Sequence, residues 1–257
     1  MAPRPIPHTS RDRRFYLDPD SPDDNPRLAD QELHHALHVN RLGAGDRLWG
    51  LDGKGRAQFL EVTDSTRRGL TLKPLGESRS EPRPGTPGAP LAHLEIGLSL
   101  PKPGKAEEMI DRLTQLGVAR LQPLTMRRSA DHARKLSKSR TEKLERAGRE
   151  AMKQCLRLWP MELGAPMPLT DWLAASQPTL LLDPRTDTTL ARACADHPPH
   201  MPLRLLIGPE GGFHPDELQL TNDASVQSVT LKGHILRIET AAELAGGMAL
   251  QLLRPRG

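Results

Sequence analysis

The apolar residues from Leu94 onward fall into two alternating patterns along the chain. Short apolar runs predict strands, and these lie at residues 94–100, 118–124, 179–182, 203–207 and 226–231. Apolar residues three and four positions apart predict helices, and these lie at residues 105–116, 137–156, 190–197, 215–220 and from about 238 onward. This alternation is typical of an α/β domain with a mostly parallel sheet.

The first 75 residues have a different pattern, because strand-like runs dominate them. Apolar runs predict strands at residues 15–17, 46–51, 56–62 and 70–75, with one short helix at 31–39. The turn Asp52-Gly53-Lys54-Gly55 is a strong hairpin signal between two of these strands. Residues 76–92 contain four Pro and three Gly, which predicts a linker. We therefore expect a small β-rich domain at 1–75 and an α/β domain at 93–257.

Two of the predicted strands are closely followed by glycine-rich turns. Gly208-Pro209-Glu210-Gly211-Gly212 follows the strand at 203–207, and Lys232-Gly233-His234 follows the strand at 226–231. Glycine allows positive φ or a close approach of a ligand to the main chain. Because ligands of open α/β sheets bind beyond the carboxyl ends of the strands, the two turns predict a shared ligand crevice.

Composition narrows the class of protein without identifying it. The net charge of +4 and a pI of about 9.3 fit a polyanionic partner. Two cysteines exclude a disulfide framework, no apolar run is long enough to span a membrane, and the first residues lack the apolar core of a signal peptide. These features favour a cytoplasmic protein.

The most basic stretch lies between Arg127 and Arg157, where eleven Lys or Arg stand against four Asp or Glu. Pairs such as Glu145 and Arg149 are spaced to form ion pairs within a helix, which favours a merely solvated helix face. The charge excess is nevertheless unbalanced, and its first part is expected to be a loop. Because cationic loops bind phosphates well, we favour RNA contact for this stretch.

His34, His35 and His38 suggest a metal site, since histidines four apart share one face of a helix. No third ligand is evident from the sequence. We therefore expect surface or RNA-contacting histidines and no metal.

The glycine turns also carry a family resemblance. The segment Ile207–Phe213, then Glu217, Ile235-Leu236-Arg237 and Glu239-Thr240-Ala241, resembles the signature of the bacterial 16S ribosomal RNA (uracil-N3)-methyltransferases of the SPOUT superfamily. The chain departs from that signature at Lys232 and Ile238. The resemblance implies a C-terminal SPOUT domain with a trefoil knot that binds S-adenosylmethionine, an N-terminal PUA-like RNA-binding barrel, and a homodimer.

The resemblance and the residue types together give candidate site residues. Candidates for the adenosylmethionine pocket are aliphatic and glycine-turn residues: Leu181, Leu182, Ile207, Gly208, Pro209, Gly211, Gly212, Leu231, Gly233, Ile235 and Leu236. Taken singly, each aliphatic residue is equally compatible with ordinary core. Candidates for contact with 16S rRNA are cations: Arg11, Arg13, Arg14, Arg127, Arg128, Arg134, Lys135, Lys138, Arg140 and Arg157.

Methylation of uracil N3 requires removal of a weakly acidic imide proton. A carboxylate can accept that proton and an arginine can stabilise the resulting anion, so Glu210 and Arg237 are the catalytic candidates. The alternatives are that Glu210 braces its loop and that Arg237 pairs with Glu239 or Glu243.

Two other functions stay open at this level: ribose 2′-O methylation by a related enzyme, and a non-catalytic RNA-binding or ribosome-assembly protein. The small residues of the last helix, including Ala245, Gly246 and Ala249, predict close packing against another backbone, and a two-fold dimer interface is the partner we expect.

Overall fold

The structure is a computed structural model that describes residues 13–89, 92–198, 201–222 and 225–253. The chain divides into two compact units. The first contains Met1–Arg83 and also Leu156–Trp159, and the second contains Pro84–Cys155 and Pro160–Gly257. Nothing in the sequence pattern pointed to the inclusion of four residues from the middle of the chain in the first unit.

The first unit is a four-stranded sheet in the order β1(Arg13–Tyr16), β2(Arg47–Leu51), β3(Arg56–Thr66) and β4(Gly69–Ser80). Strand β1 pairs in parallel with β2, and the other neighbours are antiparallel. Helix α1(Asp30–His34) continues as the π-helical turn His35–Val39, where a single α-helix was predicted. The linker prediction was wrong for residues 76–80, because β4 stays paired with β3 as far as Ser80 opposite Arg56.

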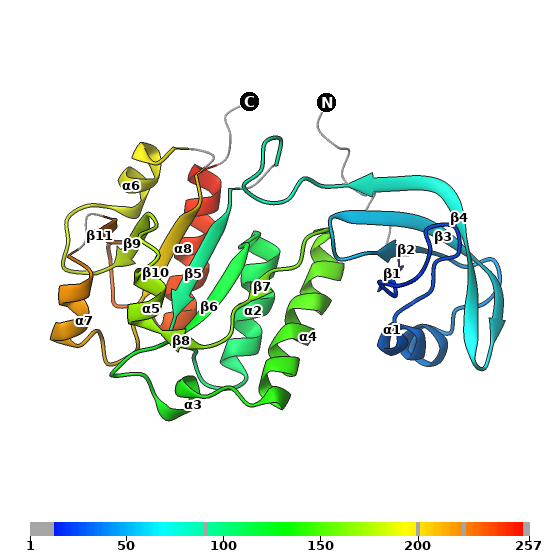
Figure 1. The fold of residues 1–257 in the computed structure, drawn as a ribbon, viewed down its shortest axis with the longest axis horizontal. Coiled ribbons are helices and arrows are strands. Elements are labelled where there is room, and N and C mark those ends of the chain that lie inside the picture. The colour runs from blue at the N-terminus through cyan, green and yellow to red at the C-terminus, as the bar shows by residue number, and fades with distance from the viewer. Residues whose placement is uncertain (1–12, 90–91, 199–200, 223–224, 254–257) are drawn as a thin grey trace. The chain divides into compact units, whose positions relative to one another are not determined.

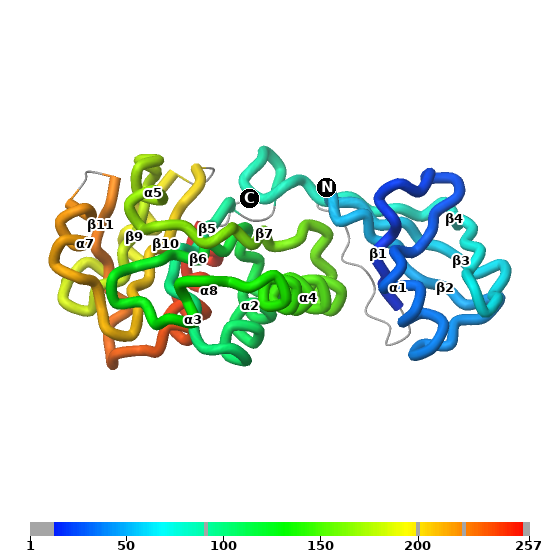
Figure 2. Tube along the Cα trace, turned by 60° about the horizontal axis from the view of Figure 1, so that its bottom comes forward, coloured from blue at the N-terminus to red at the C-terminus, as the bar shows by residue number. Residues whose placement is uncertain are grey.

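The second unit is a parallel sheet in the order β11-β9-β10-β5-β6-β7, with β8 also paired to β6 (Figures 1 and 2). Its strands are β5(Leu94–Leu98), β6(Arg120–Thr125), β7(Glu162–Leu163), β8(Met167–Pro168), β9(Thr179–Leu182), β10(Leu203–Ile207) and β11(Val226–Val229). Its helices are α2(Lys105–Leu116), α3(Asp131–Arg134), α4(Lys138–Cys155), α5(Leu169–Leu173), α6(Leu190–Asp196), α7(Pro215–Leu220) and α8(Ile238–Leu252). The α/β prediction is confirmed, and the elements it missed are all of five residues or fewer.

Helices cover both faces of this sheet. Leu203, Leu205 and Ile207 of β10 pack with residues of α2, α6 and α8 in the largest core cluster. Leu206 points to the other face, where it packs with Leu169 and other residues around α5. This side-chain alternation, with period two along the strand, produces a three-layered unit.

The small residues of α8 pack within the chain. Ala245, Gly246 and Ala249 are buried, and a Cβ on Gly246 would lie 3.2 Å from the Cδ1 atom of Ile96 in β5. The expectation of close packing is confirmed, but the expected partner was wrong, because these residues bring the helix against its own sheet and cannot also form a dimer interface.

No helix in the described part of the chain is both long enough and apolar enough to cross a bilayer.

Candidate active site

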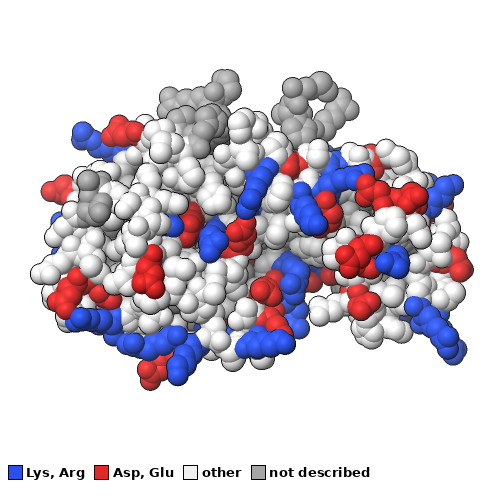
Figure 3. All heavy atoms as spheres, viewed as in Figure 1, with Lys and Arg blue, Asp and Glu red and all other residues white. Residues whose placement is uncertain are grey.

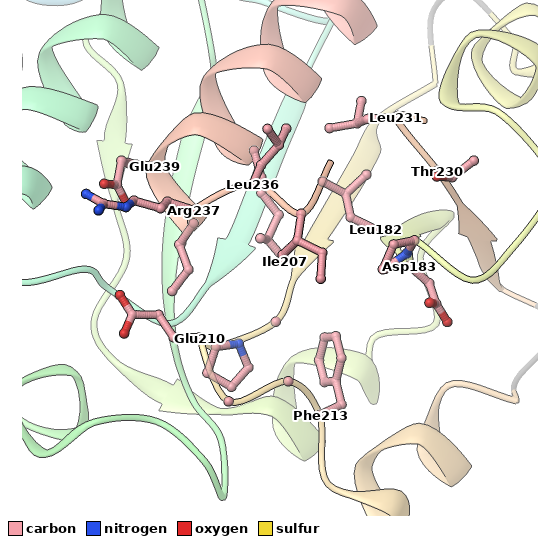
Figure 4. Close-up of a pocket in the computed structure, with 18 of the residues that line it drawn as sticks. Leu182, Asp183, Ile207, Glu210, Phe213, Thr230, Leu231, Leu236, Arg237 and Glu239 are labelled. Carbon is pink, nitrogen blue, oxygen red and sulfur yellow. The ribbon is translucent and has the colours of Figure 1, made fainter. Parts of the chain in front are cut away.

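A cavity of about 1030 Å³ opens beyond the carboxyl ends of β9, β10 and β11 (Figure 4). Its walls are residues 182–185 after β9, 207–213 at the end of β10, 229–237 at the end of β11, and the start of α8. Pro101, Lys102 and Lys105 close one side. Both glycine turns therefore face one cavity, as the sequence predicted.

Ten of the eleven pocket candidates line this cavity: Leu182, Ile207, Gly208, Pro209, Gly211, Gly212, Leu231, Gly233, Ile235 and Leu236. Leu181 does not, because it points to the opposite face of β9 and is buried with Leu206 and Trp172. The period-two alternation of a strand separates Leu181 from Leu182. Ile235 is the most exposed of the large apolar side chains in the described ranges, at 90%.

The need for glycine differs among the turn positions. Gly212 has φ 68° and Gly233 has φ 91°, a region that residues with a Cβ rarely adopt. Lys232 is also in this region, with φ 57°. Gly208 has no positive φ, so of the two roles expected for glycine in these turns only the close approach of a neighbouring group applies to it.

Glu210 and Arg237 both line the cavity and are both exposed (Figure 4). Within the described residues, neither charged group has a hydrogen-bond or ion-pair partner. Glu243, one expected alternative partner of Arg237, binds Arg112 at 3.1 Å. Both side chains are therefore available to a ligand.

Asp183 is a cavity residue that the sequence reasoning did not select, although it directly follows the strand β9. Both of its carboxylate oxygens accept hydrogen bonds of 2.9 Å from Arg185, through Nε and Nη2. These hydrogen bonds lower the pKa of Asp183, so its carboxylate stays ionised. Phe213, Lys102 and Thr230 also line the cavity and were not selected. Phe213 ends the signature segment 207–213, so the resemblance was a signal that could have found it.

The ten cations proposed to contact RNA occupy very different environments. Arg11 lies outside the described residues. Arg13 lies 3.7 Å from Asp46, Arg14 is half-buried in β1, and Arg157 is only 8% exposed. The other six lie in the basic stretch, and Figure 3 shows Lys and Arg gathered along the edge of the unit that carries α3.

Within the basic stretch, four arginines bind the protein itself. Arg127, Arg128, Arg134 and Arg140 all donate hydrogen bonds to neighbouring loops. Lys135 and Lys138 are exposed, and their side chains make no hydrogen bond or ion pair with a described residue. The short helix α3 interrupts what was expected to be one continuous loop.

The rings of His34 and His38 in the first unit contact one another, with their centroids 4.6 Å apart and their planes tilted by 48°. In the described ranges, no group of three or more His, Cys, Asp or Glu residues is arranged to hold a metal ion.

Comparison with known proteins places the chain in a family. A model of an RNA methyltransferase domain matches residues 87–249, and a model of an RNA methyltransferase PUA domain matches residues 28–75. Ribosomal RNA small subunit methyltransferase E of Synechocystis sp. is 30% identical over 227 residues, which cover 85% of this chain and 70% of that protein. The chain belongs to the ribosomal RNA small subunit methyltransferase E family.

Solved structures agree with the fold. The structure of a probable rRNA-methyltransferase from Porphyromonas gingivalis has a TM-score of 0.75 and 26% identity, over 93% of this chain and 95% of that one. The family's structure from Neisseria gonorrhoeae, bound to S-adenosyl methionine, has a TM-score of 0.76 and 22% identity, over 95% and 98%. The fold is therefore that of a SPOUT-type α/β domain following a PUA domain.

Proposed function

We propose that this protein methylates N3 of a uridine in 16S rRNA of the small ribosomal subunit, with S-adenosylmethionine as methyl donor. One observation carries the proposal: the two glycine turns of a chain in this family meet at one cavity beyond the ends of three parallel strands. Ligands of such sheets bind in that position.

The cavity fits adenosylmethionine in size and in chemistry. Its volume of about 1030 Å³ is at the upper end of the range for small-molecule sites, which are mostly apolar with a few polar groups. The aliphatic side chains of Leu182, Ile207, Leu231 and Leu236 offer an apolar surface to the adenine, and the turn at Gly233 leaves the main chain open to contact. A family member from Neisseria gonorrhoeae binds the same cofactor.

When bound, adenosylmethionine supplies an activated methyl group, so the protein has to align the acceptor and remove a proton. In this proposal the Glu210 carboxylate accepts the proton from uracil N3. The Arg237 guanidinium stabilises the negative charge that then develops on the uracil carbonyl oxygens. Both groups are exposed at the cavity and free of partners among the described residues, which leaves them able to contact the base.

The RNA is held by two regions in this proposal. The first is the PUA-matching unit, through Arg13 and Arg14 and with Arg11 as a further candidate. The second is the exposed pair Lys135 and Lys138 next to α3. Phosphate contacts from such cations provide affinity without reading sequence. The remaining candidate cations bind neighbouring loops or are buried, and their contribution to RNA binding is expected to be indirect.

We also propose that the enzyme acts in the cytoplasm during ribosome assembly, that its second domain contains a trefoil knot, and that it forms a homodimer. Because the small residues of α8 are buried, the dimer has to use another face. Leu116, Leu244 and Leu252 are exposed apolar residues on α2 and α8 and are available for it. Light scattering at micromolar concentration tests the assembly, and a fully active monomer would remove the dimer from the proposal.

Methyl transfer from tritiated adenosylmethionine to small-subunit RNA, followed by mapping of the product nucleoside, tests the function. The expected product is 3-methyluridine, present in cells with the protein and missing from cells without it. A 2′-O-methylated nucleoside would indicate a different SPOUT reaction, and RNA binding without transfer would indicate a non-catalytic protein. Glu210→Gln is expected to lower kcat by about 100-fold or more while leaving adenosylmethionine binding intact.

A further inference from the structure

Glu217 is a buried carboxylate without a cationic partner in the described residues. It is 6% exposed, and it lies in the first turn of α7, which begins just after the cavity wall formed by residues 207–213. Its Oε1 atom accepts a hydrogen bond of 2.7 Å from the backbone N–H of Arg127, and its Oε2 atom accepts one of 2.8 Å from the backbone N–H of His214. Burial of a charge without a counter-charge is unfavourable unless hydrogen bonds stabilise it.

These two hydrogen bonds have different purposes. The bond from His214 is the local half of a capping box, which a glutamate at the third helical position commonly makes. The bond from Arg127 comes from a segment 90 positions earlier in the chain and contributes nothing to the cap. Glu217 therefore joins two loops that are distant in sequence.

Strand pairing cannot fix these two loops relative to one another. Arg127 follows β6 and His214 follows β10, and the sheet order places β5 between those strands. The two loops have no shared backbone ladder, so side chains have to connect them. The hydroxyl of Ser99, directly after β5, makes a buried hydrogen bond of 2.8 Å to Ser129, which fixes the β6 loop to the end of the intervening strand but does not reach the β10 loop.

A second tie joins the same loops at the surface. The Nη1 atom of Arg128 donates hydrogen bonds of 3.0 and 3.1 Å to the backbone oxygens of Gly211 and Phe213. Gly211 and Phe213 both line the cavity. The part of the cavity wall that follows Gly208 is thus held at one end by Glu217 and along its length by Arg128.

We propose that Glu217 is a positioning residue for the methyl-transfer site: its carboxylate fixes the Gly208–Phe213 wall against the β6 loop in the geometry that binds adenosylmethionine. This inference rests on the proposed function, because it names the ligand of that cavity. Glu217 itself does not line the cavity and acts through the backbone of Arg127 and His214. The basic stretch that begins at Arg127 is, by the same contacts, part of the support of the cofactor wall.

Glu217→Gln tests the role with an almost unchanged shape, since one carboxylate oxygen is replaced by an NH₂ group that faces an N–H donor. Calorimetry at a temperature well below unfolding is expected to show about tenfold weaker adenosylmethionine binding, from the loss of a hydrogen bond to a charged group. The KM for adenosylmethionine should rise by a similar factor, while kcat at saturating cofactor stays within about twofold, because the bound cofactor itself restores the wall. Amide exchange at Arg127 and His214 should quicken.

Glu107→Gln is the matched control. Glu107 is the capping-box glutamate of α2, where it accepts a hydrogen bond of 2.6 Å from the N–H of Gly104 and joins no second loop. Its substitution should leave adenosylmethionine affinity within about twofold of wild type, as expected for a local cap. A loss equal to that of Glu217→Gln would mean that any weakened cap disturbs the cavity, and it would overturn the specific role of Glu217.

Arg128→Ala removes one of the remaining side-chain ties, which also include the ion pair between Arg127 and Asp216, and it tests the connection even if Glu217→Gln fails to fold. This variant should also bind the cofactor more weakly and show faster amide exchange at His214. The double variant Glu217→Gln with Arg128→Ala should lose less cofactor affinity than the two single losses combined, because both residues act through one wall. Additive losses of affinity would indicate that Arg128 touches the cofactor directly.

Wild-type protein that binds no adenosylmethionine would overturn the proposed function, whereas normal binding by folded Glu217→Gln would overturn only the role of Glu217.

Discussion

The ring of Phe213 occupies the space that a side chain on Gly208 would need. A Cβ built on Gly208 would lie 2.7 Å from the Cε2 atom of Phe213, and 3.0 and 3.2 Å from two further ring atoms. Both residues line the cavity (Figure 4). The absence of a side chain at position 208 therefore sets where the aromatic ring lies.

Gly208→Ala is expected to push the Phe213 ring out of place and to weaken adenosylmethionine binding, since overpacking of this kind costs about 1–3 kcal/mol. The double variant Gly208→Ala with Phe213→Ala should recover part of the affinity lost in the single glycine variant. Calorimetry on all three variants measures this. If the double variant binds no better than Gly208→Ala, the glycine is needed for direct contact between the main chain and the cofactor.

Lys135 and Lys138 are the best probes of RNA contact in the basic stretch, because they alone among its seven candidates have no side-chain hydrogen bond or ion pair within the described residues. The pair of alanine substitutions should flatten the salt dependence of RNA binding by about 0.7–0.9 in slope for each lost phosphate contact. Adenosylmethionine affinity should stay unchanged. Arg192→Ala, which removes an exposed cation from α6, is the control and should not alter the slope.

Arg134 and Arg140 call for a different expectation. Arg134 donates to the backbone oxygens of Arg127 and Ser129, and Arg140 donates to those of Pro101 and His132. Replacement of Arg134 and Arg140 should loosen the cavity rim and weaken the binding of both adenosylmethionine and RNA.

For the Lys135 and Lys138 variant, an unchanged salt slope would show that those two lysines are only solvated surface, and the N-terminal unit would then have to hold the RNA.

A buried charge cluster stabilises the amino-terminal ends of the central strands. Glu95 of β5 accepts a hydrogen bond of 2.6 Å from Trp172 Nε1 and lies 3.4 Å from the Nε atom of Arg204 in β10. Glu95→Gln leaves the Arg204 charge buried without a counter-charge, which should lower the free energy of unfolding by about 3–5 kcal/mol. Chemical denaturation followed by circular dichroism measures the change.

The control for this prediction is Glu145→Gln, which removes one partner of an exposed pair with Arg149 on α4. Exposed pairs contribute little to stability, so this variant should unfold at the denaturant concentration of the wild type. Adenosylmethionine binding by folded Glu95→Gln should also be normal, because the cavity is at the opposite ends of the strands. A similar small change in both variants would contradict the importance assigned to the cluster.

The two cysteines should differ in reactivity. Burial disfavours the thiolate and raises the pKa of Cys194 to about 11, whereas Cys155 is half-buried. A thiol reagent at neutral pH should label Cys155 and spare Cys194 until the protein unfolds, and Cys155→Ser should abolish the early labelling.

The same burial predicts a pH dependence of stability. Because the pKa of Cys194 in the folded protein lies above the unfolded value of about 8.5, the contribution of Cys194 to stability should be lost as the pH rises from about 8.5 through 11. Rapid labelling of Cys194 in the folded protein would contradict its burial.

The sequence by itself determined the order of the helices and strands in the second unit and the position of the ligand crevice. Both follow from local properties. Runs such as Leu203–Ile207 are too short and too apolar for an amphipathic helix, and Gly212 and Gly233 mark turns that require positive φ. The resemblance and the residue types named the eleven pocket candidates, and ten of them line the cavity because the carboxyl ends of parallel strands meet at one edge of the sheet.

Only the tertiary structure decided what the charged and small residues contact. The arginines at 127 and 128 looked like ligands for RNA, but the fold brings their loop beside residues 211–217 across the intervening strand β5, where backbone oxygens and carboxylates accept their hydrogen bonds. The small residues of α8 could have faced a partner or the sheet, and the burial of Gly246 against Ile96 shows which. Such outcomes depend on contacts between segments far apart in the chain, and no local pattern encodes them.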